Sequence, residues 1–536
     1  MKKAVKISLI LIGLGTIAKT QTLQEAINKT ENEMFEVAAI DFKNLIAKEP
    51  TKGNNYFYYG ENYFYNDDLD SALIQFKKGA EVDPTNALPY VGIGKILLWQ
   101  GKEADANTNL FKAKTLGPKN GNVMMELGEA YTNAPNLKNL PEAIKLLNDA
   151  IKLDAKNPEG YILLGDALLE QNPTDGSPAI KQYEKAAELN KNSVKAILRI
   201  GKLYQRGKNF NLALDYYKKA EEIDAKFAPA YREKAELYAK ANQYAKAVEN
   251  YRKYLELNNS IIARDRYAQF LFMNKNYADA VKEIQEVQIK DDSSPYLHRI
   301  LGYAYYELGD KTEKEAYVKG LNAINTFFTK TEGKNFKYIA NDFKYKGLLL
   351  AKTGNDSLGI LEIQKAIDMD PANCDLNSDI GKILVKAKKY DKAIIAFEKK
   401  ATCPKGLNGQ DYFDLGRAYF FGPKDFVKAD TCFSKLAQAN QTFAAAYFYR
   451  GKANVQLDPK NEKWAAKPHY EKALGLVKPE ERGSASNKAN VIEACEYLGY
   501  YYVVVKDNAK AKEYFEIIKG LDANNKKAND FLKTAK

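Results

Sequence analysis

Histidine and cysteine, the side chains that most often carry nucleophilic and metal chemistry, are scarce in this sequence. There are two histidines, His298 and His469, and four cysteines in 536 residues. A structural zinc site needs about four nitrogen or sulfur ligands close together, and the sequence offers neither a third histidine nor a cluster of cysteines. His298 falls on an apolar packing position of an expected helix, which favours a buried structural role. We therefore expect no metal site.

Other signatures of catalysis are missing as well. The sequence contains no GxxxxGK[ST] phosphate loop, no GxSxG elbow and no dinucleotide fingerprint between a strand and a helix. Pairs of carboxylates are frequent, but on helices such pairs are usually solvated surface groups rather than a general acid and base. The sequence thus predicts a protein that is not an enzyme and that uses no cofactor.

The first twenty residues, MKKAVKISLILIGLGTIAKT, differ from the rest of the chain. Three lysines precede an apolar run from Ile7 to Ile17, and small residues follow it. This is the form of a secretory signal peptide, and the run is too short for a comfortable membrane span. The alternative is an uncleaved amphipathic helix. We expect cleavage near Thr20–Gln21 and export to the periplasm or the outer membrane, without a lipoprotein anchor, since no cysteine precedes Cys374.

The positive charge of the chain raises the question of nucleic acid. The net charge is +12, and loss of residues 1–20 removes four lysines and no acid, which lowers it by four to +8. A basic protein invites a nucleic-acid interpretation, but export argues against it, and the lysines are scattered over solvent-facing helix positions. We expect no nucleic-acid partner, and no membrane-spanning segment after residue 20.

The sequence repeats itself with a period of 34 residues. The pentapeptide IGKIL occurs at 93–97 and again at 380–384, each time ten residues after the start of a DPxN segment. Gly60 and Gly94 lie 34 residues apart, and each is followed by an alanine twelve residues later and a large apolar residue sixteen residues later. Further units centre on Gly201, Ala235, Ala268, Gly347, Gly381 and Gly499, and longer ones on Gly128, Gly165, Gly302, Gly416 and Gly451.

This pattern resembles the tetratricopeptide repeat (TPR), a helical hairpin of 34 residues. It recurs about fourteen times and covers nearly everything after residue 20. The resemblance implies an all-α protein in which the hairpins stack into a right-handed superhelical solenoid, with the first helix of each hairpin lining a concave groove. Glycine or alanine at the eighth position of a unit, and alanine at the twentieth, let the two helices approach closely, because a larger side chain would overpack the crossing.

Two irregular segments, FFTKTEGKNF (327–336) and TCPKGLNGQ (402–410), could bend or divide the array. We expect one TPR array over residues 21–334 and a second over 335–525. The polar sequence of residues 526–536 is typical of a capping helix.

The cysteines offer one covalent link. Cys374 begins the first helix of a predicted hairpin and Cys403 ends the second helix of the same hairpin. The two ends of an antiparallel hairpin meet, so a disulfide is geometrically plausible, and export would permit it. The alternative is two unpaired small residues. Cys432 and Cys495 are expected to be free thiols.

The groove positions implied by the TPR resemblance fall into three zones. The first is aromatic and contains Phe57, Tyr58, Phe64, Tyr65 and Trp99. The second is acidic and contains Glu126, Glu129, Glu159, Asp166 and Glu170. The third is basic and contains Lys195, Arg199, Lys202, Arg206, Arg232, Arg266 and Arg299.

The basic zone is the sharpest candidate for a binding site, because arginines repeated on one face could hold a carboxylate-rich peptide through bidentate hydrogen bonds. The alternative is a charged face that only keeps the array in solution. The aromatic zone could stack on sugar rings or on apolar peptide segments.

These observations predict a scaffold of the bacterial cell envelope that binds protein or peptide partners in its groove. The alternative function is a glycan- or nutrient-binding component of an envelope uptake system. The sequence leaves the partner and the oligomeric state open.

Overall fold

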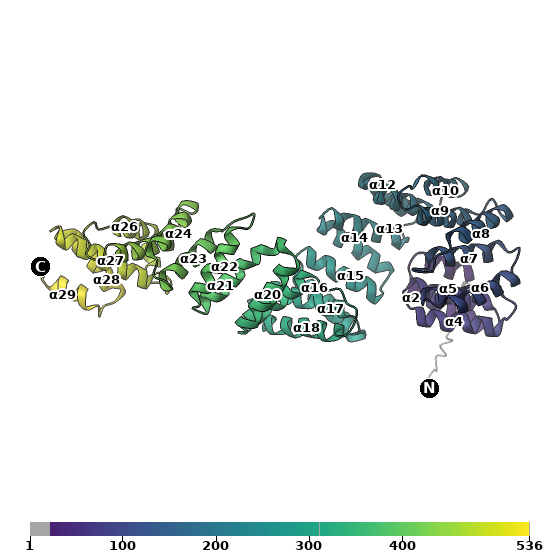
Figure 1. Ribbon diagram of the computed structural model, residues 1–536, viewed down its shortest axis with the longest axis horizontal. Coiled ribbons are helices and arrows are strands. Elements are labelled where there is room, and N and C mark those ends of the chain that lie inside the picture. Colours follow the sequence, from purple (N-terminus) through teal and green to yellow (C-terminus); the bar gives the residue numbers. More distant parts are fainter. Residues whose placement is uncertain (1–21, 310, 535–536) are drawn as a thin grey trace, which may run out of the picture. The chain divides into compact units, whose positions relative to one another are not determined.

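The computed structural model describes residues 22–309 and 311–534, and the predicted signal peptide lies outside them. Within this part of the chain every regular element is helical, with twenty-nine α-helices and two short 3₁₀-helices, η1 and η2. The prediction of an all-α protein built from about fourteen helical hairpins is confirmed, since α1 to α28 pack in consecutive pairs (Figure 1).

The described helices separate into two compact units that divide between Asp292 and Ser293. The sequence suggested a boundary one hairpin later, at residues 334–335, where the chain is irregular between the end of α18 at Thr331 and the start of α19 at Ala340. The division into two arrays at residues 334–335 stays a prediction.

Unit 1 contains eight hairpins. Their helices are α1 (Leu23–Glu31), α2 (Phe35–Lys48), α3 (Gly53–Tyr65), α4 (Leu69–Val82), α5 (Ala87–Trp99), α6 (Glu103–Leu116), α7 (Gly121–Asn133), α8 (Leu140–Leu153), α9 (Pro158–Gln171), α10 (Ser177–Leu189), α11 (Val194–Arg206), α12 (Phe210–Ile223), α13 (Ala228–Lys240), α14 (Tyr244–Leu257), α15 (Ile261–Met273) and α16 (Tyr277–Lys290).

Unit 2 contains six hairpins and a last helix. Its elements are α17 (Pro295–Leu308), α18 (Ala316–Thr331), α19 (Ala340–Lys352), α20 (Asp356–Met369), η1 (Pro371–Leu376), α21 (Asn377–Lys386), α22 (Tyr390–Ala401), α23 (Gly409–Phe421), α24 (Phe426–Ala439), α25 (Ala444–Leu457), α26 (Lys467–Leu476), η2 (Pro479–Glu481), α27 (Lys488–Val504), α28 (Asn508–Leu521) and α29 (Lys526–Thr534).

The DPxN segments punctuate the helices, although the two copies differ. In the first copy the side chain of Asn86 accepts a hydrogen bond from the backbone N–H of Leu88 and so caps α5. In the second copy Asp370 accepts from the N–H of Ala372, and the chain continues as the 3₁₀-helix η1 before α21 begins at Asn377. The repeated segment thus starts a helix in both places, but an α-helix directly in only one of them.

The close helix crossings predicted from the small residues are present. A Cβ atom added to Gly347 would lie 2.6 Å from the backbone oxygen of Gly359, and one added to Gly359 would lie 2.7 Å from the oxygen of Gly347. At Gly60 the added atom would lie 2.3 Å from the ring of Phe76, which is fully buried. The glycine of the first helix therefore makes room either for the partner backbone or for a large side chain of the second helix.

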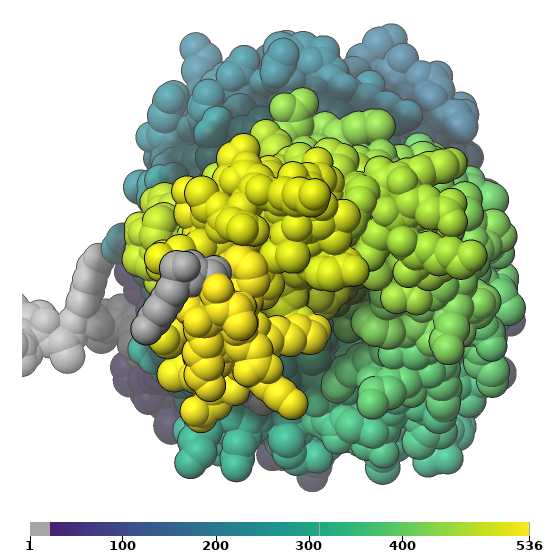
Figure 2. All heavy atoms as spheres, turned by 90° about the vertical axis from the view of Figure 1, so that its left-hand side faces the viewer, coloured from purple at the N-terminus to yellow at the C-terminus, as the bar shows by residue number. Residues whose placement is uncertain are grey.

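The last helix, α29, packs against the final hairpin through the rings of Phe515 and Phe531, whose centroids are 4.5 Å apart. Figure 2 looks at this end of the chain and shows the side chains of the last hairpin and of α29 at the surface, in yellow. The helix occupies the segment in which a cap was predicted, and it covers apolar surface that the last hairpin would otherwise expose.

Among the helices of residues 22–309 and 311–534, none combines the length and the apolar character that crossing a bilayer requires.

Candidate functional site on the inner face of unit 1

In unit 1 the first helices of successive hairpins contact one another, in the order α1, α3, α5, α7, α9, α11 and α13. The second helices make their main contacts with the first helices beside them. Packing of this kind bends an array of hairpins so that the first helices lie on its inner face. We call the solvent-facing side of these first helices the inner face.

A fully buried lysine, Lys95 of α5, lies between the first helices beneath the inner face. Its ammonium group lies 2.8 Å from a carboxylate oxygen of Glu61 on α3, 2.8 Å from one of Glu129 on α7 and 3.8 Å from one of Glu126 on α7. The hydroxyl of Tyr65 donates to Glu129 at 2.6 Å. Three helices are therefore joined by one ammonium group, which compensates charges that would otherwise be costly to bury.

The carboxyl groups around Lys95 differ in their affinity for protons. Loss of solvent, partly offset by Lys95, raises the pKa of Glu61 to about 6 and raises that of Glu126 well above its usual value. Burial has the same tendency at Glu129, but Lys95 and the hydroxyl of Tyr65 outweigh it and lower the pKa of Glu129. One oxygen of Glu61 and one of Glu126 accept no hydrogen bond from any described residue. Burial therefore favours the protonated form of Glu61 and Glu126, while Lys95 and Tyr65 favour the ionised form of Glu129.

Carboxylate oxygens of Glu61, Glu126 and Glu129 lie within 4.8 Å of one another, a spacing that would also suit a divalent cation. The ammonium group of Lys95 already supplies the positive charge at this place. The cluster is therefore best described as an internal ion-pair network.

The predicted aromatic zone divides into core and surface. Phe57 is fully buried and Phe64 is 7% exposed, so neither ring can meet a ligand. Tyr58 and Trp99 are partly buried at the inner face, where the Tyr58 hydroxyl accepts from Asn122 of α7 at 3.0 Å.

Tyr65 is the most accessible aromatic side chain of the zone. Its side chain is 47% exposed, yet loss of solvent is the first cause that raises its pKa well above the usual value. Tyr65 is therefore the ring of this zone that a partner could reach from solvent.

The basic zone is paired with carboxylates rather than open. Arg199 of α11 makes a two-oxygen contact with Asp166 of α9, at 2.9 and 3.0 Å from its Nε, and this carboxylate raises the pKa of Arg199 further. Lys195 of α11 lies 2.6 Å from Glu159 of α9. Glu159 and Asp166 of the predicted acidic zone therefore neutralise Lys195 and Arg199 of the basic zone across neighbouring repeats.

The remaining basic residues follow the same rule with one exception. Lys202 lies 3.5 Å from Glu233, and Arg266 forms a bidentate pair with Glu236 at 2.6 and 2.7 Å. Arg299 belongs to unit 2, where it donates to Asp342 at 3.0 Å. Arg206, at the end of α11, is exposed.

The turn between α1 and α2 also contacts the inner face, at residues that lie much later in the sequence. Glu33 forms a bidentate pair with Arg232 of α13, at 2.9 and 3.1 Å, and accepts from the hydroxyl of Tyr254 of α14 at 2.8 Å. Glu31 lies 3.2 Å from Lys195. We call residues 31–33 the clasp turn. Its contacts show that unit 1 curves far enough for its first hairpin to meet its sixth and seventh.

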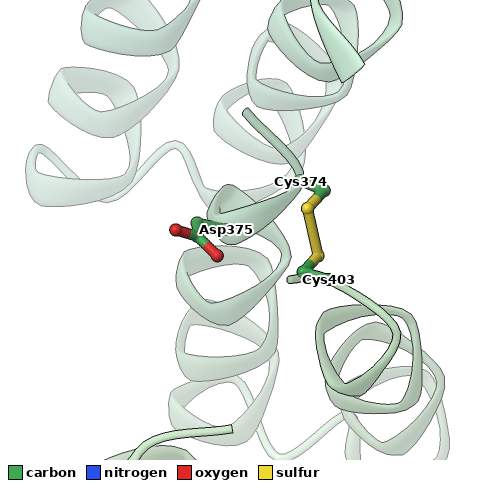
Figure 3. Close-up of side chains that lie close together, drawn as sticks. All are labelled: Cys374, Asp375 and Cys403. Carbon is green, nitrogen blue, oxygen red and sulfur yellow. A yellow bond between two sulfur atoms is a disulfide. The ribbon is translucent and has the colours of Figure 1, made fainter. Parts of the chain in front are cut away.

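The four cysteines lie in unit 2. The sulfur atoms of Cys374 in η1 and Cys403 after α22 are joined as a disulfide, with their Cα atoms 6.0 Å apart (Figure 3). Asp375 lies beside the bridge and binds the ammonium group of Lys400 at 2.6 Å. Cys432 and Cys495 are buried and unbridged.

The sequence analysis did not identify Lys95, although the sequence contains a signal for its contacts. Glu61, Lys95 and Glu129 each follow the small residue at the eighth position of consecutive units, 34 residues apart. In a solenoid, equal positions of neighbouring repeats lie side by side. Comparing the ninth position across units would have placed a lysine between two glutamates.

Comparison with known proteins gives the family. Residues 194–227 and residues 232–295 each match a model described as tetratricopeptide repeat. The C-terminal part of a TPR repeat-containing protein from Cytophaga hutchinsonii is 35% identical, and the match covers 50% of this chain and 99% of that one, with a TM-score of 0.42. The chain belongs to the tetratricopeptide repeat family.

Two curated proteins also resemble part of the chain. The CTR9 homolog of Arabidopsis thaliana is 24% identical over 175 residues, and anaphase-promoting complex subunit 3 of Schizosaccharomyces pombe is 22% identical over 169 residues. These matches cover 31% and 32% of this chain, but only 16% and 25% of the two relatives.

Proposed function

We propose that this protein is a non-enzymatic scaffold of the cell envelope that binds partner proteins along the inner face of unit 1. TPR repeats imply a protein–protein interaction scaffold. To this scaffold function we add a location for the binding surface and a cellular compartment.

The accessible polar side chains of the inner face carry the proposal. Tyr65 on α3 is 47% exposed, and the side chain of Lys202 on α11 is 44% exposed. They stand on helices that are fixed by the buried Lys95 network and by ion pairs between repeats. A partner would therefore meet side chains that are already ordered, which reduces the entropy lost on binding.

Two features of the chain support a location in the cell envelope. The basic start and apolar run of residues 1–20 have the form of a signal peptide, and the Cys374–Cys403 disulfide suits an oxidising compartment. We propose a periplasmic or outer-membrane-associated protein that serves envelope assembly, secretion or motility. A mature N-terminus near Gln21 in the periplasmic fraction would support this, and an intact N-terminus in the cytoplasm would contradict it.

The glycan-binding alternative is not favoured by the geometry. Stacking on a sugar needs an accessible aromatic face, but Phe57 and Phe64 lie in the core, and Tyr65 is the one exposed ring of the aromatic zone.

Site-directed photo-crosslinking in the native cell tests the proposal. Tyr65 and Lys202, on the inner face, are each replaced by benzoylphenylalanine. Matched controls carry the same residue at Phe111 of α6, which is 72% exposed, and at Lys218 of α12, whose side chain is 50% exposed. We expect both inner positions to capture the same protein and the outer positions to capture none. Capture from the outer positions alone, or from no position, would refute binding at the inner face.

A further inference from the structure

The clasp turn places two carboxylates on the basic residues of the inner face. Glu31 forms an ion pair with Lys195, and Glu33 accepts two hydrogen bonds from Arg232. These contacts join residues that are 164 and 199 positions apart. An acidic segment with one residue between its two carboxylates is thus already bound at this site, and it belongs to the same chain.

When this contact opens, the cations of Lys195 and Arg232 each keep a carboxylate partner. Lys195 also lies 2.6 Å from Glu159, and Arg232 also lies 3.2 Å from Glu233, so each cation keeps a partner on its own array. The side chains of Lys195 and Arg232 are 27% and 32% exposed, so water can reach both. The single contact between Glu31 and Lys195 has access to water and contributes little to stability, whereas the bidentate pair of Glu33 with Arg232 contributes more.

The hydrogen bonds and ion pairs of the clasp turn join two parts of unit 1 whose core clusters are distinct. The core cluster around α1 and α2 contains Ala38 and Phe42, and the cluster around α11 to α13 contains Ile197 and Tyr217; these two clusters share no residue. The described contacts of the clasp turn with this region are hydrogen bonds and ion pairs, including one from Asn32 to Asp224 at 3.3 Å. Salt therefore weakens the two ion pairs of the contact, those of Glu31 and Glu33.

The charge that the clasp turn covers determines what could replace it. Lys195, Arg199, Lys202 and Arg232 face three carboxylates of their own array, those of Glu159, Asp166 and Glu233. Without the clasp turn Lys195 and Arg232 each lose one of their two carboxylate partners, and the guanidinium of Arg232 presents a fork that matches a carboxylate.

We propose that Lys195 and Arg232 form the binding site for an acidic segment of a partner, and that the clasp turn fills this site until such a segment displaces it. The proposal rests on the scaffold function proposed above and adds the chemistry of the partner and the means by which access is controlled. The clasp turn is an internal ligand that competes with the partner.

The first test measures opening and needs no partner. Spin labels are attached through cysteines introduced at Ile40 on α2 and Lys240 on α13, both exposed, because the native cysteines are buried or joined in the disulfide. We expect a short, narrow distance distribution in the otherwise native protein. It should become longer and broader in the Glu31→Gln/Glu33→Gln variant and in 0.5 M salt. The control Glu36→Gln, an exposed acid next to the turn, should leave it unchanged.

The second test uses a defined probe, a fluorescent peptide of residues 28–35 (NKTENEMF), added to the full chain. We expect the Glu31→Gln/Glu33→Gln variant to bind the peptide about tenfold more tightly than the native protein, because the internal competitor is gone. Adding Arg232→Ala to this variant should abolish binding, and a peptide with both glutamates replaced by glutamine should not bind.

The outcomes separate the two proposals. An unchanged distance in the double variant refutes the clasp. Opening without binding of the acidic peptide refutes the acidic partner, while crosslinking from Tyr65 and Lys202 still judges the scaffold function independently. Equal binding by the native protein and the double variant refutes the competition.

Discussion

The ammonium group of Lys95 lies 2.8 Å from a carboxylate oxygen of Glu129, and the two residues stand 34 positions apart, at the same place in consecutive repeats. Glu61 holds that place one repeat earlier and lies at the same distance from the ammonium group. A repeat that positions its backbone for packing thus also aligns side chains of opposite charge across three hairpins. The stability of unit 1 and the order of its inner face should depend on this alignment.

Replacement of Lys95 tests the network directly. Lys95→Met leaves two directly bonded carboxylates without their cation, and breaking a buried pair in this way costs about 3–5 kcal/mol of unfolding free energy. The matched control is Lys382→Met at the equivalent position of the second IGKIL segment, where the side chain is 38% exposed and 3.8 Å from Asp411. We expect the control to lose less than about 1 kcal/mol. Urea unfolding followed by circular dichroism measures both, and equal losses would contradict the network.

The protonation of the cluster predicts how stability changes with pH. The pKa of Glu61 in the folded chain is about 6, above its usual 4.5, so folding binds its proton more tightly. The tighter proton binding adds about 2 kcal/mol to the free energy of unfolding. This stabilisation is complete below pH 4.5 and is lost as pH rises through 6. The pKa of Glu126 is raised too, so its contribution has the same sign.

Glu126→Gln removes one of these titrations and one negative charge. We expect the variant to be more stable than the native protein at pH 8, because the folded native protein must ionise Glu126 there, and the advantage should shrink toward pH 4.5. Urea midpoints at several pH values measure the difference, with the exposed Glu81→Gln as control. An advantage that grows as pH falls would contradict the assignment.

Replacing glycine by alanine should have opposite effects on stability at a helix crossing and away from one. Gly347→Ala would place a methyl group 2.6 Å from the backbone oxygen of Gly359, and overpacking of this kind costs about 1–3 kcal/mol. Gly520→Ala, inside α28, meets no atom within 4 Å and should stabilise the helix by about 0.5–1 kcal/mol. Thermal unfolding distinguishes them; a gain at both positions would mean that the crossing is looser than described.

The disulfide should stabilise unit 2 by restricting its unfolded chain. Cys374 and Cys403 are separated by 29 residues, and a loop of that length corresponds to roughly 3–4 kcal/mol in the chain-entropy model. Cys374→Ser/Cys403→Ser should therefore lower the unfolding free energy by about this amount, and a reductant should affect the native protein but not the variant. Intact mass after alkylation without reductant checks the bridge itself, since labelling of Cys374 and Cys403 would show that it is absent.

The fold could be predicted from the sequence because each hairpin repeats a local rule. Glycine and alanine at fixed positions, as at Gly60 and Gly347, reveal the helix crossings without any long-range information. The same periodicity contained the contact of Lys95 with Glu61 and Glu129, which went unnoticed because the groove positions were grouped by charge along the chain rather than compared at equal positions.

The clasp contact could not be predicted in this way. Glu33 and Arg232 are 199 residues apart, and their meeting depends on the accumulated rotation of about six hairpins. Each hairpin contributes a small rotation that the sequence pattern does not specify, so a carboxylate from the first turn could not be assigned to an arginine of the seventh hairpin.

Hydrogen–deuterium exchange of the full chain, with and without the partner captured from Tyr65 and Lys202, tests the central claim most directly. The account predicts slower exchange on binding in α3, α5, α7 and α11, whose side chains form the inner face, and little change in α4, α6, α8 and α12. Slower exchange confined to the second helices of the hairpins, or to unit 2, would contradict it.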